Sequence, residues 1–172
     1  MSDGPVKRVT LWVRDAERSL RIYRDALGLS VLEDKRLSGV GIARMIGLQS
    51  ASLRIVHLAT PGATHGWVGL YEIADDAPSA VAALPDPGGF PRYGQATVVV
   101  DIEAIRAAGG GAHSMQQVVA KLRATPGVRF ITEPSEYIKT TPSEAMRAGR
   151  YGEMIFFDPD NIAVSLIDYA PL

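Results

Sequence analysis

The sequence predicts an α+β protein made of two tandem βαβββ modules, and three observations support this fold class. Residues 8–13, Arg-Val-Thr-Leu-Trp-Val, and residues 95–100, Gln-Ala-Thr-Val-Val-Val, share one order of polar, apolar and threonine positions. Residues 69–73 and 162–166 are similarly related, and both pairs recur at roughly half the chain length, which indicates an internal duplication. Each half also contains one helix pattern among several strand patterns. We expect modules at 5–75 and 94–172, sharing one compact domain and joined by a Pro- and Gly-rich linker at 76–93.

In the first half, residues 7–13 are rich in β-branched and aromatic types and are predicted to form a strand. Asp15 is a suitable N-cap for the following helix. Apolar residues then recur at helical spacing, at Leu20, Tyr23 and Leu27, and Gly28 provides a C-terminal stop. The remaining elements are predicted to be a strand at 29–33, a helical turn at 41–47, and strands at 53–58 and 68–73 that flank a turn at Pro61-Gly62.

The second half repeats this order with additions. After the strand at 95–100, an insertion containing three glycines at 109–111 precedes a helix capped by Ser114, whose apolar face is Met115, Val118, Val119 and Leu122. Strands are then expected at 128–132, 154–157 and 163–167. A hairpin turn at 158–161, Asp-Pro-Asp-Asn, joins the last two strands, and a long loop is expected over 134–152.

Composition excludes several classes of function. The 172 residues are 47% apolar, enough for a sizeable core, and the formal charge is −1 with both signs interspersed. Such a chain has no basic stripe for phosphates, so nucleic acid is not an expected partner. The absence of cysteine excludes thiolate chemistry and is typical of the cytoplasm. No stretch approaches the ~20 apolar residues that span a bilayer, and no signal-peptide pattern begins the chain.

Several segments together resemble the vicinal oxygen chelate superfamily: Val-Thr-Leu-Trp-Val-Arg-Asp at 9–15, then 19–23, 26–29, and Phe-Asp-Pro-Asp-Asn at 157–161. This superfamily includes glyoxalase I, bleomycin and fosfomycin resistance proteins, methylmalonyl-CoA epimerase and extradiol dioxygenases. The resemblance covers nearly the whole chain. It implies that the two modules form a cupped sheet around a site, that a divalent metal there binds a substrate in the enzymes of the family, and that the protein is a homodimer.

The resemblance also places the four metal-ligand positions on the opening and closing strands, at Arg8, Glu72, Gln95 and Ser165. Glu72 alone has the residue type that suits such metals, since an Arg guanidinium accepts nothing and repels a cation. We therefore expect no metal cofactor. Instead, Arg8 could pair with Glu72 in the cup. The other interpretation is that Arg8 turns to solvent and Glu72 is a half-exposed strand residue.

Strand alternation adds further residues to the predicted cup, because side chains two positions apart share a face. Thr10 and Trp12 accompany Arg8, and Val68 and Leu70 accompany Glu72. Thr97 and Val99 accompany Gln95, and Ala163 and Ile167 accompany Ser165. A mostly apolar lining with a few polar groups is typical of small-molecule pockets. Trp12 could stack on a flat ligand, or it could pack in the core or a dimer contact.

Other candidates are open to two interpretations. His57 lies within a predicted strand, where it faces the ligand or serves as a hydrogen-bonded structural residue, and His65 and His113 are expected at surface positions. The segment 134–152 contains aromatic and cationic side chains that could cover the mouth of a pocket, or it is a solvated loop or dimer contact. The three adjacent glycines lack the Lys-Ser/Thr of a phosphate-binding loop.

Three functions remain open. The first is a metal-free protein of the bleomycin-resistance type that binds a small, partly aromatic molecule in an apolar cup. The second is a divergent lyase, isomerase or dioxygenase, which is metal-dependent through another ligand set or uses Glu72 as a catalytic general base. A nearby Arg8 would lower the pKa of that carboxyl, which opposes the role of base. The third is an interaction module without a ligand.

Overall fold

The first half of the chain forms a four-stranded sheet in the computed structural model, which describes residues 6–48, 51–73, 90–91, 93–111 and 114–172. Its strands lie in the order β1 (Arg8–Val13), β4 (Trp67–Ile73), β3 (Ser52–Ala59) and β2 (Ser30–Ser38). β1 runs parallel to β4, whereas β4, β3 and β2 are antiparallel neighbours. The helix of this module is α1 (Ala16–Leu20), continued by the π-helical η1 (Arg21–Ala26), and the short α2 (Val40–Met45) follows β2. The predicted βαβββ order is therefore present.

The second half forms a five-stranded sheet with the same order of equivalent strands. β5 (Thr97–Asp101) runs parallel to β9 (Ala163–Ala170), which pairs with β8 (Gly149–Phe157), and both β6 (Arg129–Phe130) and β7 (Ser135–Lys139) pair with β8. The helix equivalent to α1 is α4 (Met115–Arg123), and the insertion before it contains an additional helix, α3 (Ile102–Ala107). The chain is thus an α+β protein with two tandem βαβββ modules.

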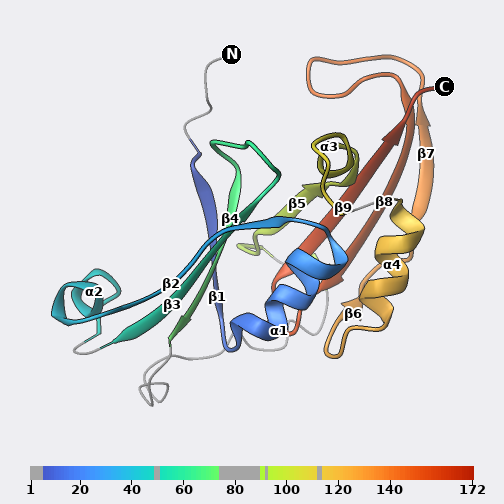
Figure 1. The fold of residues 1–172 in the computed structure, drawn as a ribbon. Coiled ribbons are helices and arrows are strands. Elements are labelled where there is room, and N and C mark those ends of the chain that lie inside the picture. The colour runs from blue at the N-terminus through green and yellow to red at the C-terminus, as the bar shows by residue number, and fades with distance from the viewer. Residues whose placement is uncertain (1–5, 49–50, 74–89, 92, 112–113) are drawn as a thin grey trace.

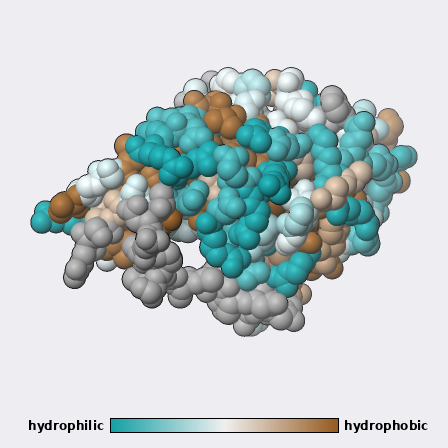
Figure 2. All heavy atoms as spheres, turned by 60° about the horizontal axis from the view of Figure 1, so that its bottom comes forward, coloured by the Kyte–Doolittle hydropathy of each residue, from teal (hydrophilic) through white to brown (hydrophobic). Residues whose placement is uncertain are grey.

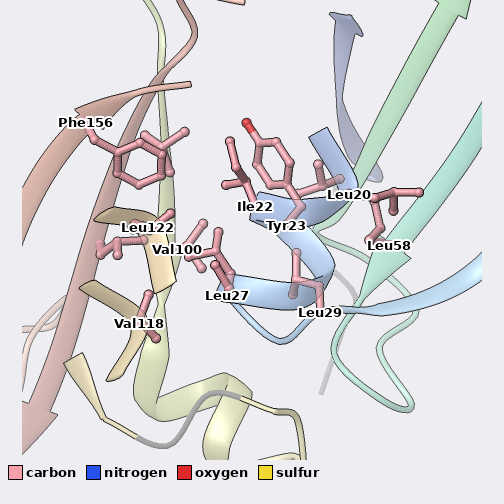
Figure 3. Close-up of a cluster of buried hydrophobic side chains, with 14 of the residues drawn as sticks. Leu20, Ile22, Tyr23, Leu27, Leu29, Leu58, Val100, Val118, Leu122 and Phe156 are labelled. Atoms are coloured by element: carbon pink, nitrogen blue, oxygen red, sulfur yellow. The ribbon is translucent and has the colours of Figure 1, made fainter. Parts of the chain in front are cut away.

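The helical run α1–η1 and helix α4 lie between the two sheets and form one core with both (Figure 1). Figure 3 shows Leu58 of β3 on one side of α1 and η1, and Phe156 of β8 with Leu122 of α4 on the other. Leu58 and Phe156 are both fully buried. Because each sheet contributes one side to this shared core, its other side faces outward, and the two outward sides point away from each other.

Local sequence signals position the helices as predicted. The Asp15 side chain accepts a hydrogen bond from the Arg18 amide at the start of α1, and the Ser114 side chain does the same for Gln117 at the start of α4. Gly28 follows η1 with a φ of 88°, a conformation that costs a glycine little and ends the helical run. The caps and this stop fix where each helix lies on its sheet.

The hairpin turn at 158–161 joins the two modules, in addition to connecting β8 and β9. The buried Asp158 carboxylate accepts hydrogen bonds from the amides of Asp160 and Ile162, within its own turn, and from the Tyr23 hydroxyl of η1. Asp160 pairs with Arg14 at 2.6 Å and with Arg18 at 2.8 Å. The turn at 158–161 of the second module therefore anchors the helix of the first module.

The structure corrects the prediction of a long loop over 134–152. β7 adds an outer strand within this segment, and β8 begins at Gly149, earlier than expected. Tyr137 lies opposite Tyr151, and their rings stack with centroids 5.4 Å apart. The predicted strand over 128–132 is reduced to β6. Most of the predicted linker at 76–93, and His113, lie outside the described residues.

No helix in the described ranges is long and apolar enough to cross a membrane. On the surface shown in Figure 2, hydrophilic residues cover the middle and hydrophobic residues form separate patches. Among the residues that the structure describes, this side offers no single broad apolar surface of the kind that marks a docking site. Residues that the sequence predicts for a site, such as Arg8, Trp12 and Val99, lie on the outward sides of the two sheets.

Candidate functional site

The outward side of the first sheet gathers aromatic and charged side chains from all four strands. Residues paired across neighbouring strands point to the same side, and the register places Arg8 beside Trp67, Trp12 beside Tyr71, His57 beside Gly69 and Glu33 beside His57. We call this surface the first outer face. It consists of Arg8, Thr10 and Trp12 of β1, Glu33 and Lys35 of β2, Ile55 and His57 of β3, and Trp67, Gly69 and Tyr71 of β4.

Aromatic contacts organise this face. The Trp12 and Tyr71 rings meet edge to face with centroids 5.4 Å apart, and the Trp67 ring lies 5.8 Å from the imidazole of His57. The Arg8 guanidinium lies 5.6 Å from the centre of the Tyr71 ring. Trp12 remains 46% exposed although it has an aromatic neighbour. A large apolar ring held in position and still accessible is suited to stacking against a flat ligand.

Three polar side chains form a hydrogen-bonded chain across the same face. His57 Nδ1 is 3.1 Å from Glu33 Oε2, and His57 Nε2 is 3.2 Å from Tyr71 Oη. Glu33 also accepts from Lys35 at 2.8 Å. His57 is buried, whereas Tyr71 is half-buried. The imidazole is therefore placed between a carboxylate at one end and a phenol that reaches the surface at the other.

The small residue at position 69 makes room for this arrangement. A side chain there would place its Cβ 3.0 Å from the Tyr71 ring and 3.4 Å from the His57 ring. The contact with Tyr71 is tight, so a side chain at this position would require that ring to shift by a few tenths of an ångström. Gly69 thus allows His57 and Tyr71 to approach across β3 and β4.

The charges around the imidazole set its protonation. Burial lowers the pKa of His57, and the positive charge of Arg8 lowers it further, while Glu33 acts in the opposite direction. The hydrogen bond from Lys35 lowers the pKa of Glu33, which is therefore ionised at neutral pH. A neutral imidazole beside a carboxylate donates its Nδ1–H to that carboxylate. Its Nε2 is then left as an acceptor for the Tyr71 hydroxyl.

Three residues predicted for the cup lie on the opposite side of the sheet. Leu70 is fully buried in the core with Val68, and Glu72 points toward α1, where its Oε2 accepts the Ala16 amide at 3.1 Å. The prediction that Glu72, Leu70 and Val68 share a face with Arg8 is therefore wrong. The parallel register of β1 and β4 explains this, because it pairs Glu72 with Val13, a core residue of β1.

The predicted ion pair between Arg8 and Glu72 is also wrong. Arg8 lies opposite Trp67 near one end of the sheet, and Glu72 lies opposite Val13 at the other end of β1 and on its other side. Each side chain has a different neighbour, which is the Tyr71 ring for Arg8 and the first turn of α1 for Glu72. A carboxylate at a helix N-terminus is favourably placed, so Glu72 is satisfied without a cation.

The second outer face carries the remaining predicted residues. Val99 is paired with Ser165, and Thr97 with Ala163, so these side chains share the side of the sheet that faces away from α4. Gln95 precedes β5, and its buried Oε1 has no hydrogen-bond partner among the described residues. Val99 is 65% exposed. The first and second outer faces point in opposite directions, so one chain brings Arg8, Thr10 and Trp12 together but keeps them apart from Thr97, Gln95 and Ser165.

A hollow of about 180 Å³ lies at one end of the second outer face and is lined by Asp101, Glu103, Arg147, Tyr151, Ile167 and Tyr169. Arg147 pairs with Glu103, and its guanidinium lies 3.8 Å from the centre of the Tyr169 ring. The charged groups there already satisfy one another. This hollow is therefore a weaker candidate than the first outer face.

The residues present do not fit the metal that the sequence resemblance implies. Arg8 brings a fixed positive charge to one ligand position, and the carboxylate of Glu72 is on the helix side of its sheet. The described residues contain no group of three or more His, Cys, Asp or Glu that could hold a metal ion. No chemical step is therefore assigned to a metal at these four positions.

Sequence reasoning missed Glu33, Tyr71 and Trp67 as site residues. The available signal was the alternation in β4, where Val68 and Leu70 suit a core and leave Trp67, Gly69 and Tyr71 to the outer side. His57 was recognised as a candidate and is hydrogen-bonded at both nitrogens. His65 lies in the turn before β4, near Thr64.

A model of the Glyoxalase/Bleomycin resistance protein/Dioxygenase superfamily matches residues 6–166. A glyoxalase family protein from Bacillus cereus has a TM-score of 0.65 at 15% identity, over 98% of this chain and 96% of that one. The trypanothione-dependent glyoxalase I of Leishmania major has a TM-score of 0.54 at 15% identity, over 96% and 87% of the two chains.

A glyoxalase I variant from Zea mays has a TM-score of 0.53 at 18% identity and is matched over 95% of this chain but 46% of its own, so this chain spans about half its length. At such identities these likenesses show the fold alone. Among curated proteins, no sequence matches the chain.

Proposed function

The chain belongs to the Glyoxalase/Bleomycin resistance protein/Dioxygenase superfamily, and from this premise we propose that it binds a small, partly aromatic molecule on the first outer face without a metal ion. One observation carries the proposal. Both tryptophans of the chain, together with Tyr71, lie on this face beside a guanidinium and a buried imidazole. Apolar rings with a few polar groups are the usual composition of a small-molecule site.

The polar groups give the face a preference among ligands. Arg8 supplies a permanent positive charge, and the Tyr71 hydroxyl can exchange hydrogen bonds. Trp12 offers an exposed ring. A flat ring with an oxygen substituent would use all three, by stacking on Trp12 while its oxygen reaches Tyr71 and Arg8.

A closed cup needs a second copy of the chain. The two outer faces of one chain point away from each other, so a ligand on the first outer face is covered when the second outer face of another copy lies over it. The 65% exposure of Val99 leaves apolar surface available for such a contact. We propose a homodimer with two such cups, consistent with the prevalence of twofold assemblies.

Two measurements test this function. Untagged protein is exposed to excess manganese, zinc, nickel or iron(II), dialysed and analysed for metal, and we expect far less than one metal ion per chain. Sedimentation velocity is expected to give a dimer that Val99→Asp converts to a monomer. A stoichiometric metal that survives dialysis would contradict the metal-free site, and a wild-type monomer would contradict the shared cup.

An enzymatic function is the second candidate, and the hydrogen-bonded chain from Glu33 through His57 to Tyr71 favours it. Such a chain can move a proton, which is the basis of general acid–base catalysis. Glu72 supports this candidate less well, because its carboxylate is engaged at the start of α1. Proton transfer on the first outer face would therefore involve Tyr71.

A further inference from the structure

We propose that Glu33, His57 and Tyr71 form a proton relay through which the first outer face takes up a weakly acidic aromatic hydroxyl compound, a phenol, as its anion. This inference rests on the proposed binding function and adds the chemical class of the ligand and the fate of its acidic proton. The geometry is a line of three groups, with 3.1 Å from carboxylate to imidazole and 3.2 Å from imidazole to phenol.

The direction of the relay follows from its first member. Glu33 is ionised and hydrogen-bonded by Lys35, so it can only accept. It therefore takes the Nδ1–H of His57, which fixes the tautomer and turns the Nε2 lone pair toward Tyr71. The Tyr71 hydroxyl donates to this lone pair. Its own oxygen keeps lone pairs that can accept a hydrogen bond from a bound hydroxyl group.

The proton transfer balances without any further reactant. The O–H bond of the ligand breaks and its proton forms a new O–H bond on Tyr71, while the original hydroxyl proton of Tyr71 passes to Nε2 of His57. The products are the ligand anion and an imidazolium. The imidazolium is paired with Glu33, and the anion lies on the face that carries the guanidinium of Arg8. Each new charge thus has an opposite charge nearby.

Charged or polar groups from the three other strands of the sheet face His57, and they partly oppose one another. They are Glu33 and Lys35 of β2, Arg8 of β1 and the hydroxyl of Tyr71 on β4. In the free protein, burial and Arg8 keep the imidazole neutral. A bound anion would offset the charge of Arg8, so the imidazole accepts a proton more readily when the phenolate is present. Binding and proton transfer are therefore coupled.

The experiment uses the full-length protein and two probes of nearly equal shape. One is 4-nitrophenol, whose neutral and ionised forms absorb at different wavelengths, and the other is 4-nitroanisole, which has no acidic proton. Affinities are measured by calorimetry, and the absorption spectrum of bound 4-nitrophenol is recorded at a pH where the free probe is mostly neutral. We expect the bound probe to show the phenolate spectrum and to bind about tenfold more tightly than 4-nitroanisole, the ratio that corresponds to one additional hydrogen bond to a charged group.

Two variants separate the relay from the effect of Arg8. Tyr71→Phe keeps the ring against Trp12 and removes the hydroxyl, and His57→Gln keeps a hydrogen-bonding side chain without a titratable nitrogen. Both variants are expected to bind 4-nitrophenol in its neutral form and to lose the preference for it over 4-nitroanisole. Tyr93→Phe is the matched control, because Tyr93 is fully exposed, and it should behave as the wild type.

The outcomes distinguish the two proposals. If both probes bind with similar affinity and bound 4-nitrophenol shows the neutral spectrum, the relay is overturned and the binding function stands. If Tyr71→Phe and His57→Gln still bind the phenolate, Arg8 alone explains the ionisation and the relay is again overturned. If neither probe binds to the wild type, the proposed aromatic site itself fails. A phenolate spectrum in the wild type that both variants lose supports the relay.

Discussion

The hydroxyl of Tyr23 donates a hydrogen bond to the carboxylate of Asp158, and the two oxygens lie 3.1 Å apart in the buried joint between the modules. Tyr23 belongs to η1 of the first module, and Asp158 begins the turn between β8 and β9 of the second. Both residues are inaccessible to solvent. Burial raises the pKa of Tyr23 well above its ordinary value, and Asp158 raises it further, so the phenol remains a donor at neutral pH.

Removing this hydroxyl should destabilise the whole chain. Tyr23→Phe deletes the donor and leaves the buried carboxylate of Asp158 with one partner fewer. We expect a loss of about 1.5–3 kcal/mol in the free energy of unfolding at pH 7.5, measured by urea denaturation. The exposed Tyr93→Phe serves as control and should change stability by less than about 0.5 kcal/mol. Equal stability of the two variants would show that the joint does not depend on this bond.

Asp158 should also make stability depend on pH. Burial raises its pKa from an ordinary 3.8 to about 6, although the hydrogen bonds from Ile162 and Asp160 oppose this. The folded protein thus binds a proton at a higher pH than the unfolded chain. The contribution of this group to stability is therefore present in full below pH 4 and is lost as the pH rises through 6. The difference between the two pKa values corresponds to a change of about 3 kcal/mol in the free energy of unfolding between these pH limits.

The matched variant for this prediction is Asp158→Asn, which keeps the shape and an acceptor for the two turn amides. The difference in unfolding free energy between the wild type and this variant should shift in favour of the wild type as the pH falls from 7.5 to 5. Parallel curves over that range would mean that Asp158 keeps the same charge throughout.

Glu72 should act as a helix cap and not as a base. Glu72→Ala removes the acceptor for the Ala16 amide and the negative charge at the start of α1, with an expected cost of about 1 kcal/mol in unfolding free energy. Glu72→Gln retains the acceptor and should cost less. Neither variant should alter the affinity for an aromatic probe. A large loss of binding or turnover at unchanged stability would return Glu72 to the site.

Trp12 should contribute to ligand binding as well as to stability. Its ring is 46% exposed and contacts Tyr71, so Trp12→Ala is expected to lower the affinity for an aromatic ligand by about tenfold or more. The free energy of unfolding should also fall, by about 0.5–1.5 kcal/mol for the aromatic pair and by a further amount for the buried part of the ring. Met45→Ala removes an apolar side chain that is 75% exposed on α2, away from this face, and should leave the affinity unchanged. Equal affinity in Trp12→Ala would place the ligand elsewhere.

Much of the fold follows from patterns in the sequence. The caps at Asp15 and Ser114 and the stop at Gly28 are local signals, and they occur where predicted because each depends on neighbours only a few positions away. β7 was missed because a short exposed strand that pairs with one neighbour carries little apolar pattern.

The composition of the site could not be predicted in the same way. The register between β4 and β1 decides which side chains of β4 point outward. A shift of this register by one position turns every side chain of the strand to the other side. Glu33 depends on a β-bulge between Val31 and Glu33, which brings its carboxylate opposite His57. Three strands therefore have to be aligned before the chain from Glu33 to Tyr71 becomes visible, and no single segment carries that information.

The most direct test of the central claim uses protein that has been treated with a chelator and dialysed. Binding of 4-nitroanisole to this protein is measured by the quenching of its tryptophan fluorescence. Trp12 and Trp67 are the two tryptophans of the chain and both lie on the first outer face, so the signal reports on that site. We predict saturable quenching that added manganese, zinc, nickel or iron(II) does not change. Quenching that appears only after one equivalent of such a metal is added would contradict the account.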